Sequence, residues 1–156
     1  MNKQNDDCGQ RRIFLRKAAI MDLELLYKWR NHPKTRDASH NTNEISIAEH
    51  ERWLKASLLN PDREIYIAVE NGCPVGTIRI DRTDETCELS WTVAPECTGR
   101  GIGKRIVREV AEKIKGCLRA EVKTGNKASM RIAEYAGLRL ENERDGILFY
   151  CRDALG

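Results

Sequence analysis

The glycine-rich stretch at residues 93–105, V-A-P-E-C-T-G-R-G-I-G-K-R, constrains the fold of this chain more than any other segment. An alternating apolar segment leads into it, Pro95 interrupts the alternation, and an amphipathic segment follows. Glycines allow the backbone to approach a ligand closely, and the first N–H groups of a helix attract anions. The stretch therefore predicts a strand, a phosphate-binding loop and a helix, in that order.

Residue spacing excludes the two best-known phosphate loops. The pattern G-x-x-x-x-G-K-[ST] fails because Thr98 stands at the first glycine position and Arg105 follows Lys104. The pattern G-x-G-x-x-G fails because it needs a glycine at Lys104, and because such a loop normally follows the first strand of a parallel sheet. What remains is a strand followed by x-x-x-G-x-G.

Val93-x-Pro95 followed by Gly99-Arg100-Gly101-Ile102-Gly103 resembles motif A of the GNAT superfamily of acyl-CoA N-acyltransferases. The resemblance implies that the loop holds the pyrophosphate of coenzyme A and that acetyl-CoA is the acyl donor. Thr98 departs from the family, which most often has Arg or Gln there. Binding is then expected to depend on backbone amides, with Arg100 or Lys104 supplying charge. Taken alone, the loop also fits a glycine turn without a ligand.

The order of predicted elements matches the GNAT fold over nearly the whole chain. We expect an α/β (α+β) fold with a mixed, mostly antiparallel sheet of about seven strands, flanked by about four helices. Residues 1–10 are expected to be a flexible segment, and 11–156 a single acyltransferase domain. Periodicity and turn signals predict strands at 12–17, 64–70, 75–80, 87–93, 118–123, 139–144 and 147–151, and helices at 22–30, 46–59, 102–114 and 126–136.

A second motif, Asn126-x-x-Ser129-x-Arg131-x-x-Glu134-x-x-Gly137-Leu138, resembles motif B in the form seen among ribosomal-protein N-terminal acetyltransferases. Many GNAT enzymes carry, seven residues after this asparagine, a tyrosine that protonates the leaving thiolate, but this chain has Ala133. Tyr135 lies about 200° further around the helix and does not simply replace it. The two resemblances assign these residues to the coenzyme: Thr92, Val93, Gly99, Arg100, Gly101, Ile102, Gly103, Lys104, Asn126, Ser129 and Arg131.

Direct transfer from a thioester to an amine needs a base, because most primary amines are protonated at pH 7. Glu88 lies on the polar face of the strand before the loop, where several GNAT enzymes keep a glutamate in this role. An ordinary solvated strand residue is the alternative interpretation. The N–H groups of Thr92 and Val93 are candidates for stabilising the oxyanion.

The acceptor is indicated by W-R-N-H-P-x-x-R, from Trp29, and I-S-x-x-E-H-x-x-W, from Ile45. These segments resemble the amino-sugar N-acetyltransferases of the pseudaminic-acid pathway, and that resemblance implies a nucleotide-linked amino sugar. Arginines can bind its diphosphate bidentately. Residues assigned to the acceptor are Arg30, Asn31, Arg36, His50, Trp53 and Trp91.

Several alternatives stay open at this point. The tryptophans fit a core role, and Arg30 and His50 fit helix ends equally well. A peptide N-terminal amine, an aminoglycoside or a polyamine is another possible acceptor, although no strongly acidic segment favours a polyamine. Thr98 and Ala133 motivate a different class, a non-catalytic regulatory domain that binds acyl-CoA.

Composition limits the partners. The formal charge is +3 and acidic residues are interleaved with basic ones, so no nucleic-acid-binding stripe is evident. The six cysteines form no C-x-x-C pair, so no metal is expected. No apolar run approaches the roughly 20 residues of a membrane helix. We expect a cytoplasmic enzyme without membrane contact, as a monomer or a homodimer.

Overall fold

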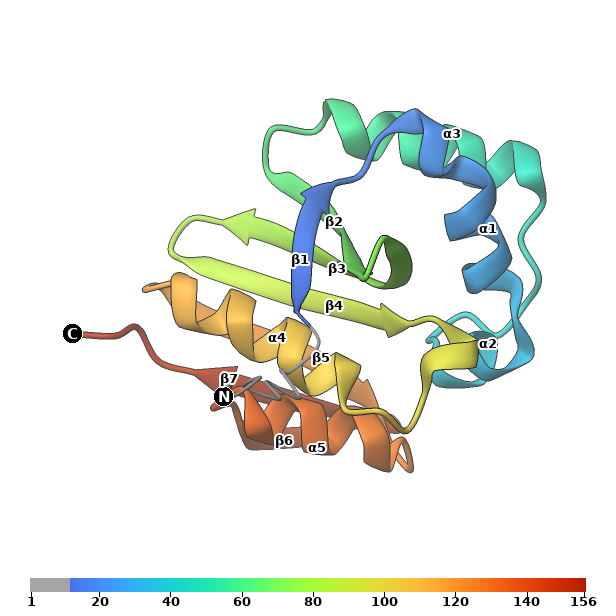
Figure 1. The fold of residues 1–156 in the computed structure, drawn as a ribbon. Coiled ribbons are helices and arrows are strands. Elements are labelled where there is room, and N and C mark those ends of the chain that lie inside the picture. Colours follow the sequence, from blue (N-terminus) through green and yellow to red (C-terminus); the bar gives the residue numbers. More distant parts are fainter. Residues whose placement is uncertain (1–11) are drawn as a thin grey trace, which may run out of the picture.

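The computed structural model describes residues 12–156, and Figure 1 shows that its strands form one twisted sheet with helices on both faces. The sheet has seven strands in the order β1-β2-β3-β4-β5-β7-β6. The pair β4–β5 is parallel and the other neighbours are antiparallel, which confirms the mixed, mostly antiparallel sheet. The strands are β1 Ile13–Lys17, β2 Arg63–Glu70, β3 Cys73–Thr83, β4 Thr86–Val93, β5 Cys117–Lys123, β6 Arg139–Arg144 and β7 Ile147–Arg152. The flexible segment expected at 1–10 lies outside the described residues.

Among the described residues there are five α-helices, one more than the sequence predicts: α1 Leu23–Asn31, α2 Pro33–Ala38, α3 Ile47–Leu59, α4 Ile102–Lys113 and α5 Lys127–Tyr135. The additional helix is α2. Pro33 ends α1 as expected, but it is also the first residue of α2, where a missing N–H removes no helical hydrogen bond. The His32 ring caps this helix by accepting from the Lys34 amide at 3.2 Å.

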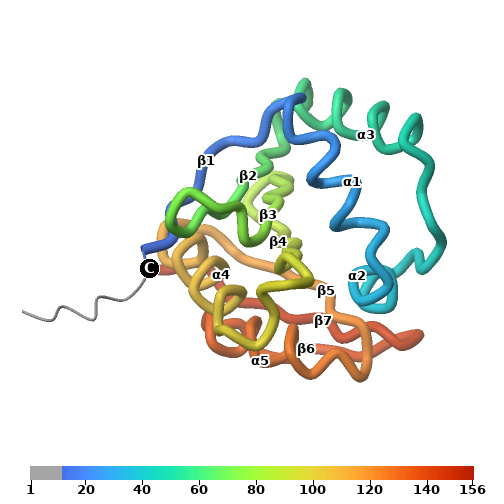
Figure 2. The backbone as a smooth tube through the Cα atoms, turned by 45° about the vertical axis from the view of Figure 1, so that its right-hand side comes forward, coloured from blue at the N-terminus to red at the C-terminus, as the bar shows by residue number. Residues whose placement is uncertain are grey.

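The helices cover opposite faces of the sheet. Figures 1 and 2 show α4 and α5 on one face, and α1 and α3 on the other. On the α4 face, a Cβ at Gly76 would lie 3.2 Å from Ile106, so helix and sheet are in close contact there. On the other face the fully buried Ile67 and Leu54 belong to the same core cluster as Trp29. The tryptophan of α1 is thus a core residue.

Strands β4 and β5 diverge, and this divergence positions the site. Their pairing runs only from Thr86–Cys117 to Glu88–Arg119. Beyond that pair β4 continues to Val93 and β5 continues to Lys123 without further pairing between them. A wedge therefore opens between the two strands, lined by backbone groups that have no cross-strand partner.

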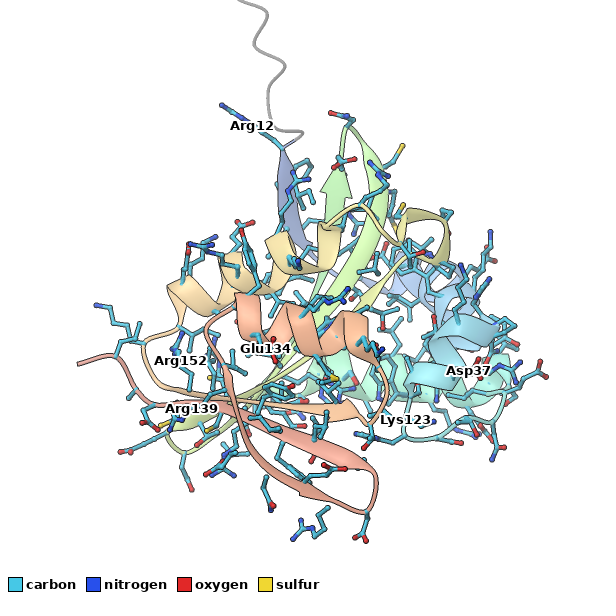
Figure 3. The ribbon with its side chains drawn as sticks, turned by 90° about the horizontal axis from the view of Figure 1, so that it is seen from below. Arg12, Asp37, Lys123, Glu134, Arg139 and Arg152 are labelled. Carbon is cyan, nitrogen blue, oxygen red and sulfur yellow. The ribbon has the colours of Figure 1, made fainter. Side chains whose placement is uncertain are left out.

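Arg152 of β7 fastens the end of α4 to the sheet. Its guanidinium donates to the carbonyls of Ala111 at 2.7 Å, Ile114 at 2.5 Å and Gly116 at 2.9 Å. Ala111 belongs to the last turn of α4, Ile114 is its C-cap residue and Gly116 lies just before β5, so one side chain supplies donors where the carbonyls of a helix end lose intrahelical partners. Figure 3 labels Arg152 near Arg139.

We expect Arg152→Met to lower the free energy of unfolding by about 2–3 kcal/mol, because buried carbonyls lose a charged donor. Arg139→Met is the matched control, since Arg139 only pairs at 3.3 Å with the exposed Asp153, and such pairs contribute about 0–1 kcal/mol. Urea unfolding of both variants measures the difference. Equal losses would contradict this role of Arg152.

No helix among residues 12–156 is both long enough and apolar enough to span a membrane.

Candidate active site

A cavity of about 750 Å³ lies where β4 and β5 diverge. Its walls come from the end of β4, the glycine loop, the first turn of α4, the end of β5, the start of α5, and α2 with the segment after it. The two motifs found in the sequence therefore meet in one place. The predicted residues that line it are Arg30, Trp91, Thr92, Val93, Gly99, Gly101, Ile102, Gly103, Lys104, Asn126, Ser129 and Arg131.

The glycine loop presents the open N-terminus of α4 to this cavity. Gly99 and Gly101 have φ angles of +81° and +74°, which side chains other than glycine rarely adopt. Gly101 is the N-cap residue and brings no capping side chain, so the N–H groups of the first turn are left for a ligand. Lys104 adds the only lysine charge of the loop to the same wall. The arrangement suits a phosphate group.

Gly103 has a packing role that its position in the motif does not reveal. A Cβ there would lie 2.5 Å from the Cδ1 of Ile132 in α5 and 3.1 Å from a methyl group of Val93 in β4. The missing side chain lets three elements approach one another at the phosphate site. Packing, together with ligand approach, explains this glycine.

The Arg100 side chain points away from the cavity. Its Nη2 donates to Glu70 Oε1 at 2.5 Å, and Arg105 Nη1 lies 3.4 Å from Glu70 Oε2. Glu70 is at the end of β2 and is only 4% exposed. The hypothesis that Arg100 supplies phosphate charge thus differs from the structure, in which Arg100 fastens the loop to β2 and Lys104 is the cation of the loop that lines the cavity.

We expect Glu70→Gln to raise the KM for acetyl-CoA, the donor that motif A implies, about tenfold, which is about 1.4 kcal/mol, with kcat little changed. The reason is that the loop loses an ionic anchor while the reacting groups stay in place. Glu109→Gln is the control, because Glu109 only pairs with Lys113 on the outer face of α4. An unchanged KM in a folded Glu70→Gln protein would contradict the anchoring role.

Helix α5 contributes Asn126 and Ser129. Asn126 Oδ1 accepts the Ser129 amide at 3.1 Å, which caps the helix and leaves the Asn126 side-chain NH₂ for a ligand. The Trp91 indole Nε1 donates to Ser129 Oγ at 3.3 Å. The sequence assigns Trp91 to the acceptor, but its indole N–H points toward α5, to a serine that the sequence assigns to the coenzyme.

The hydrogen-bond alternation along β4 separates the two predicted oxyanion donors. Ala94 N donates to Val75 O at 2.8 Å, so Ala94 directs its polar backbone groups toward β3. Successive residues of a strand alternate in this direction. Thr92 therefore faces its β3 partner Thr77, whereas the N–H groups of Val93 and Trp91 face the wedge. Val93 fits the predicted backbone role, and Thr92 contributes to the wall of the cavity.

The opposite side of the cavity carries polar residues that sequence reasoning missed. Glu121 Oε2 lies 3.0 Å from His40 Nε2, and Lys123 Nζ donates to the Asp37 carbonyl at 3.0 Å. Figure 3 shows Lys123 at the end of β5 beside Asp37 of α2. These contacts attach α2 and the following segment to β5. Further lining residues of this side are Lys34, Thr35, Ser39, Asn41, Arg79 and Ser90.

Glu88 is half-buried at the apex of the wedge, as the last β4 residue that pairs with β5. It is not part of the cavity lining, but the next two residues of β4, Leu89 and Ser90, are. Burial raises its pKa, and the neighbouring carboxylates Glu121 and Asp81 raise it further, against the opposing effects of Arg79 and His40. A raised pKa brings a carboxylate closer to the range useful for a base at neutral pH.

Arg30, Arg36 and His50 form a cluster of basic side chains beside the cavity, which we call the buried cluster because each has one nitrogen shielded from solvent. Arg30 lines the cavity and donates to the Asn41 carbonyl at 2.9 Å. Within residues 12–156, Arg30 Nη1, Arg36 Nε and His50 Nε2 are buried nitrogens without a hydrogen-bond partner. Burial and then Arg36 lower the pKa of Arg30, and burial and then Arg30 lower the pKa of His50. The cluster therefore has nitrogens to spare for a ligand, and the positive charges of its two arginines repel one another.

Two other predicted acceptor residues lie outside the cavity lining. Asn31 bonds both backbone groups of Ile45, accepting at 2.9 Å and donating at 2.8 Å, so it holds the segment between α2 and α3. Trp53 is 37% exposed and stacks on His50 with ring centroids 5.5 Å apart. Asn31 thus acts as a structural clamp, and Trp53 covers the buried histidine.

A family model and a known protein both match most of this chain. The family model described as acetyltransferase (GNAT) domain matches residues 12–139. Acetyltransferase PseH of Campylobacter jejuni is 24% identical over 134 residues, which cover 83% of this chain and 85% of that protein.

Solved structures share the fold. A domain from Methanocaldococcus jannaschii superposes with a TM-score of 0.80 at 20% identity, covering 92% of this chain and 99% of that one. Spermidine N-acetyltransferase from Vibrio cholerae, in complex with CoA and spermine, superposes with a TM-score of 0.80 at 13% identity, covering 92% of this chain and 96% of that one. Aminoglycoside acetyltransferase AAC(6')-Ib, in complex with coenzyme A, superposes with a TM-score of 0.78 at 20% identity, covering 91% of this chain and 95% of that one. These likenesses confirm the predicted fold.

Proposed function

Because the chain belongs to the GNAT acetyltransferase family, we propose that it transfers the acetyl group of acetyl-CoA directly to the primary amine of a nucleotide-linked amino sugar. The pyrophosphate of the coenzyme binds the first turn of α4, and the pantetheine arm passes Asn126 and Ser129 into the wedge. The acceptor enters from the side of α2.

The charge of the acceptor side is the observation that supports this substrate class. Arg30, Lys34, Arg79 and Lys123 line that side, and Glu121 is the carboxylate among the lining residues. The unpartnered nitrogens of the buried cluster lie next to it. Anionic groups such as a diphosphate satisfy arginine donors in pairs and relieve the repulsion between Arg30 and Arg36.

Polycationic acceptors fit this wall poorly. The V. cholerae neighbour was solved with spermine, and another neighbour is an aminoglycoside acetyltransferase. Several ammonium groups would face several fixed cations here, and like charges brought together cost several kcal/mol. The resemblance of the α1–α3 segments to amino-sugar acetyltransferases, and the similarity to acetyltransferase PseH, favour the anionic acceptor.

The transfer follows from the positions of the chain's own groups. Glu88 accepts the amine proton through a water molecule, since it adjoins the lining without being part of it. The neutral amine attacks the thioester carbonyl, whose oxygen accepts a hydrogen bond from the Val93 N–H on the wedge side of β4. The nitrogen of the adduct is then positively charged, and it loses its second proton through Glu88 to solvent. The C–S bond then breaks, and the coenzyme leaves as its thiolate.

Thiol release from acetyl-CoA tests this function with a panel of amines. The panel contains a UDP-linked amino sugar, the same amino sugar without the nucleotide, spermidine, kanamycin and a peptide with a free N-terminus. We expect the highest kcat/KM for the UDP-linked sugar. A higher value for the peptide or a polycation would overturn the acceptor class, and tight coenzyme binding without turnover of any amine would indicate a regulatory domain.

A further inference from the structure

Asp81 of β3 lies between two arginines, beside the proposed base. Its Oδ1 accepts from Arg63 Nε at 2.6 Å, and its Oδ2 accepts from Arg79 Nε at 2.9 Å. Arg63 also donates through Nη1 to Ser57 Oγ of α3 at 3.0 Å. Both carboxylate oxygens of Asp81 are therefore engaged, and the contact with α3 holds this group of side chains in place.

The proposed base Glu88 is within reach of one of these arginines. Strands β3 and β4 are antiparallel neighbours (Figure 1), and Arg79 lies opposite Ser90, two residues from Glu88. Arg79 and Glu88 are thus diagonal neighbours on one face, roughly 7–8 Å apart, a span that long side chains can bridge. Arg79 instead bonds Asp81, and its Nη2 donates to Ser90 Oγ at 3.4 Å. No hydrogen bond or ion pair of the Glu88 carboxylate is found within residues 12–156.

We propose that Asp81 is a positioning residue for the transfer: it holds the Arg79 guanidinium in the cavity wall and so keeps it from forming an ion pair with Glu88. The proposal rests on the acetyl transfer proposed above, with Glu88 as its base. It does not depend on which amine is the acceptor.

An ion pair with arginine would weaken the proposed base. A guanidinium in contact with a carboxylate favours its charged form and can lower its pKa by about 1–3. It would also occupy the oxygens that must receive the amine proton. In the structure Arg79 acts on Glu88 only at a distance, opposing the burial and the carboxylates of Glu121 and Asp81 that raise the pKa of Glu88. The bond to Asp81 therefore keeps the base available.

The other basic groups near Glu88 are less able to pair with it. His40, from the segment after α2, lowers the pKa of Glu88, but its Nε2 lies 3.0 Å from Glu121 Oε2 and is already paired there. Arg119 of β5 is opposite Glu88, but its side chain is exposed, so a pair with Glu88 would be screened by solvent. The position of Arg79 therefore decides whether Glu88 is paired.

Carboxyl-carbon NMR of the coenzyme-free protein tests the proposal without turnover, with the Glu88 signal assigned by its loss in Glu88→Gln. In Asp81→Asn, Arg79 is released and the pKa of Glu88 should fall by about 1–3. The lost charge of Asp81 acts in the same direction, so the comparison is repeated without the arginine. In the Arg79→Gln background, Asp81→Asn should lower this pKa by less than half as much. Equal falls in both backgrounds would overturn the proposal.

Arg79→Gln alone is a second test, which holds even where Asp81→Asn does not fold. If Asp81 keeps the arginine away, removing the guanidinium should raise the pKa of Glu88 by less than about 1, since a direct ion pair lowers a carboxylate pKa by about 1–3. A larger rise would mean that Arg79 already pairs with Glu88, and it would overturn the proposal.

Steady-state kinetics supplies the catalytic readout of the same pair. Asp81→Asn should lower kcat at neutral pH about 3–30-fold, which is part of the contribution of a general base, and leave the KM for acetyl-CoA within about twofold. In the Arg79→Gln background, Asp81→Asn should change kcat by less than about twofold, because the residue that it positions is gone. Equal losses of kcat in both backgrounds would overturn the proposal.

Arg63→Met is the control for a purely structural role of Asp81. It removes the other partner of Asp81 and the bond to Ser57, so it should lower the midpoint of urea unfolding. The pKa of Glu88 should stay in place, because Arg79 keeps its bond to Asp81. A fall as large as in Asp81→Asn would overturn the proposal. If no amine is acetylated, the proposed function fails, while the pKa of Glu88 in these variants still supports or overturns the placement of Arg79.

Discussion

Glu88→Gln is expected to lower kcat at neutral pH by about 10²–10⁴-fold, the usual contribution of a positioned general base. Glutamine keeps the size and the polar character of the side chain but cannot accept the amine proton. The calorimetric Kd for coenzyme A should stay unchanged, because Glu88 stands at the apex of the wedge and outside the cavity lining. Glu96→Gln, at an exposed glutamate before the loop, is the matched control.

The assignment of Glu88 as the base also predicts the direction in which kcat changes with pH. The pKa of Glu88 is raised, chiefly by burial and then by Glu121 and Asp81. The carboxylate is active only when deprotonated, so kcat should fall toward acid with an inflection above the ordinary glutamate range. Glu121→Gln removes a negative charge that repels Glu88. The acidic fall of kcat should therefore move to lower pH, while the maximum kcat at higher pH remains.

Glu121 is the competing base, because it lines the cavity directly. If Glu121→Gln abolished turnover and Glu88→Gln retained it, the base assignment would move to Glu121. An acidic limb that stayed in place in Glu121→Gln would contradict the electrostatic coupling between the two carboxylates.

Arg30→Met is expected to reduce kcat/KM for a UDP-linked amino sugar about 10–150-fold, because a hydrogen bond to a charged group contributes about 1.5–3 kcal/mol. The same substitution should leave kcat/KM for the nucleotide-free amino sugar within about twofold. Arg30 has both a place in the cavity and a nitrogen without a partner. Competition between the two acceptors in one reaction, followed by mass spectrometry, measures the ratio directly.

Arg52→Met is the control for Arg30→Met, since Arg52 is exposed on α3 and lies outside the cavity lining. Arg36→Met should resemble Arg30→Met with a smaller loss, because Arg36 belongs to the buried cluster but not to the lining. An equal loss with both acceptors would mean that Arg30 supports the fold of α1 and α2 and does not recognise phosphate.

The parts of the site that could be predicted from sequence are those whose chemistry lies within a few consecutive residues. The glycine loop needs its positive φ angles locally, and Asn126 caps the helix that it begins. The seven strands could be predicted equally well, because the alternation of apolar and polar residues and the turn residues are local signals too. The sequence predicts one helix too few because it misses α2. A proline after α1 fits both the end of one helix and the first position of the next.

The remaining features depend on partners that are distant in sequence. Arg100 is paired with Glu70, which is 30 positions away, so the sequence could not show that this guanidinium already has a carboxylate partner. Glu121 stands beside Glu88 only because β5 lies parallel to β4 and pairs with its beginning. The alternation of polar residues along β5 predicted a strand, but it could not show which strand would be its neighbour.

Initial-rate kinetics with acetyl-CoA and a UDP-linked amino sugar test the central claim most directly, because the wedge and the acceptor side form one cavity. Varying both substrates should give intersecting double-reciprocal lines, since direct attack requires both to be bound at once. Parallel lines accompanied by an acetylated enzyme in the mass spectrum, or no turnover of this acceptor, would contradict the account.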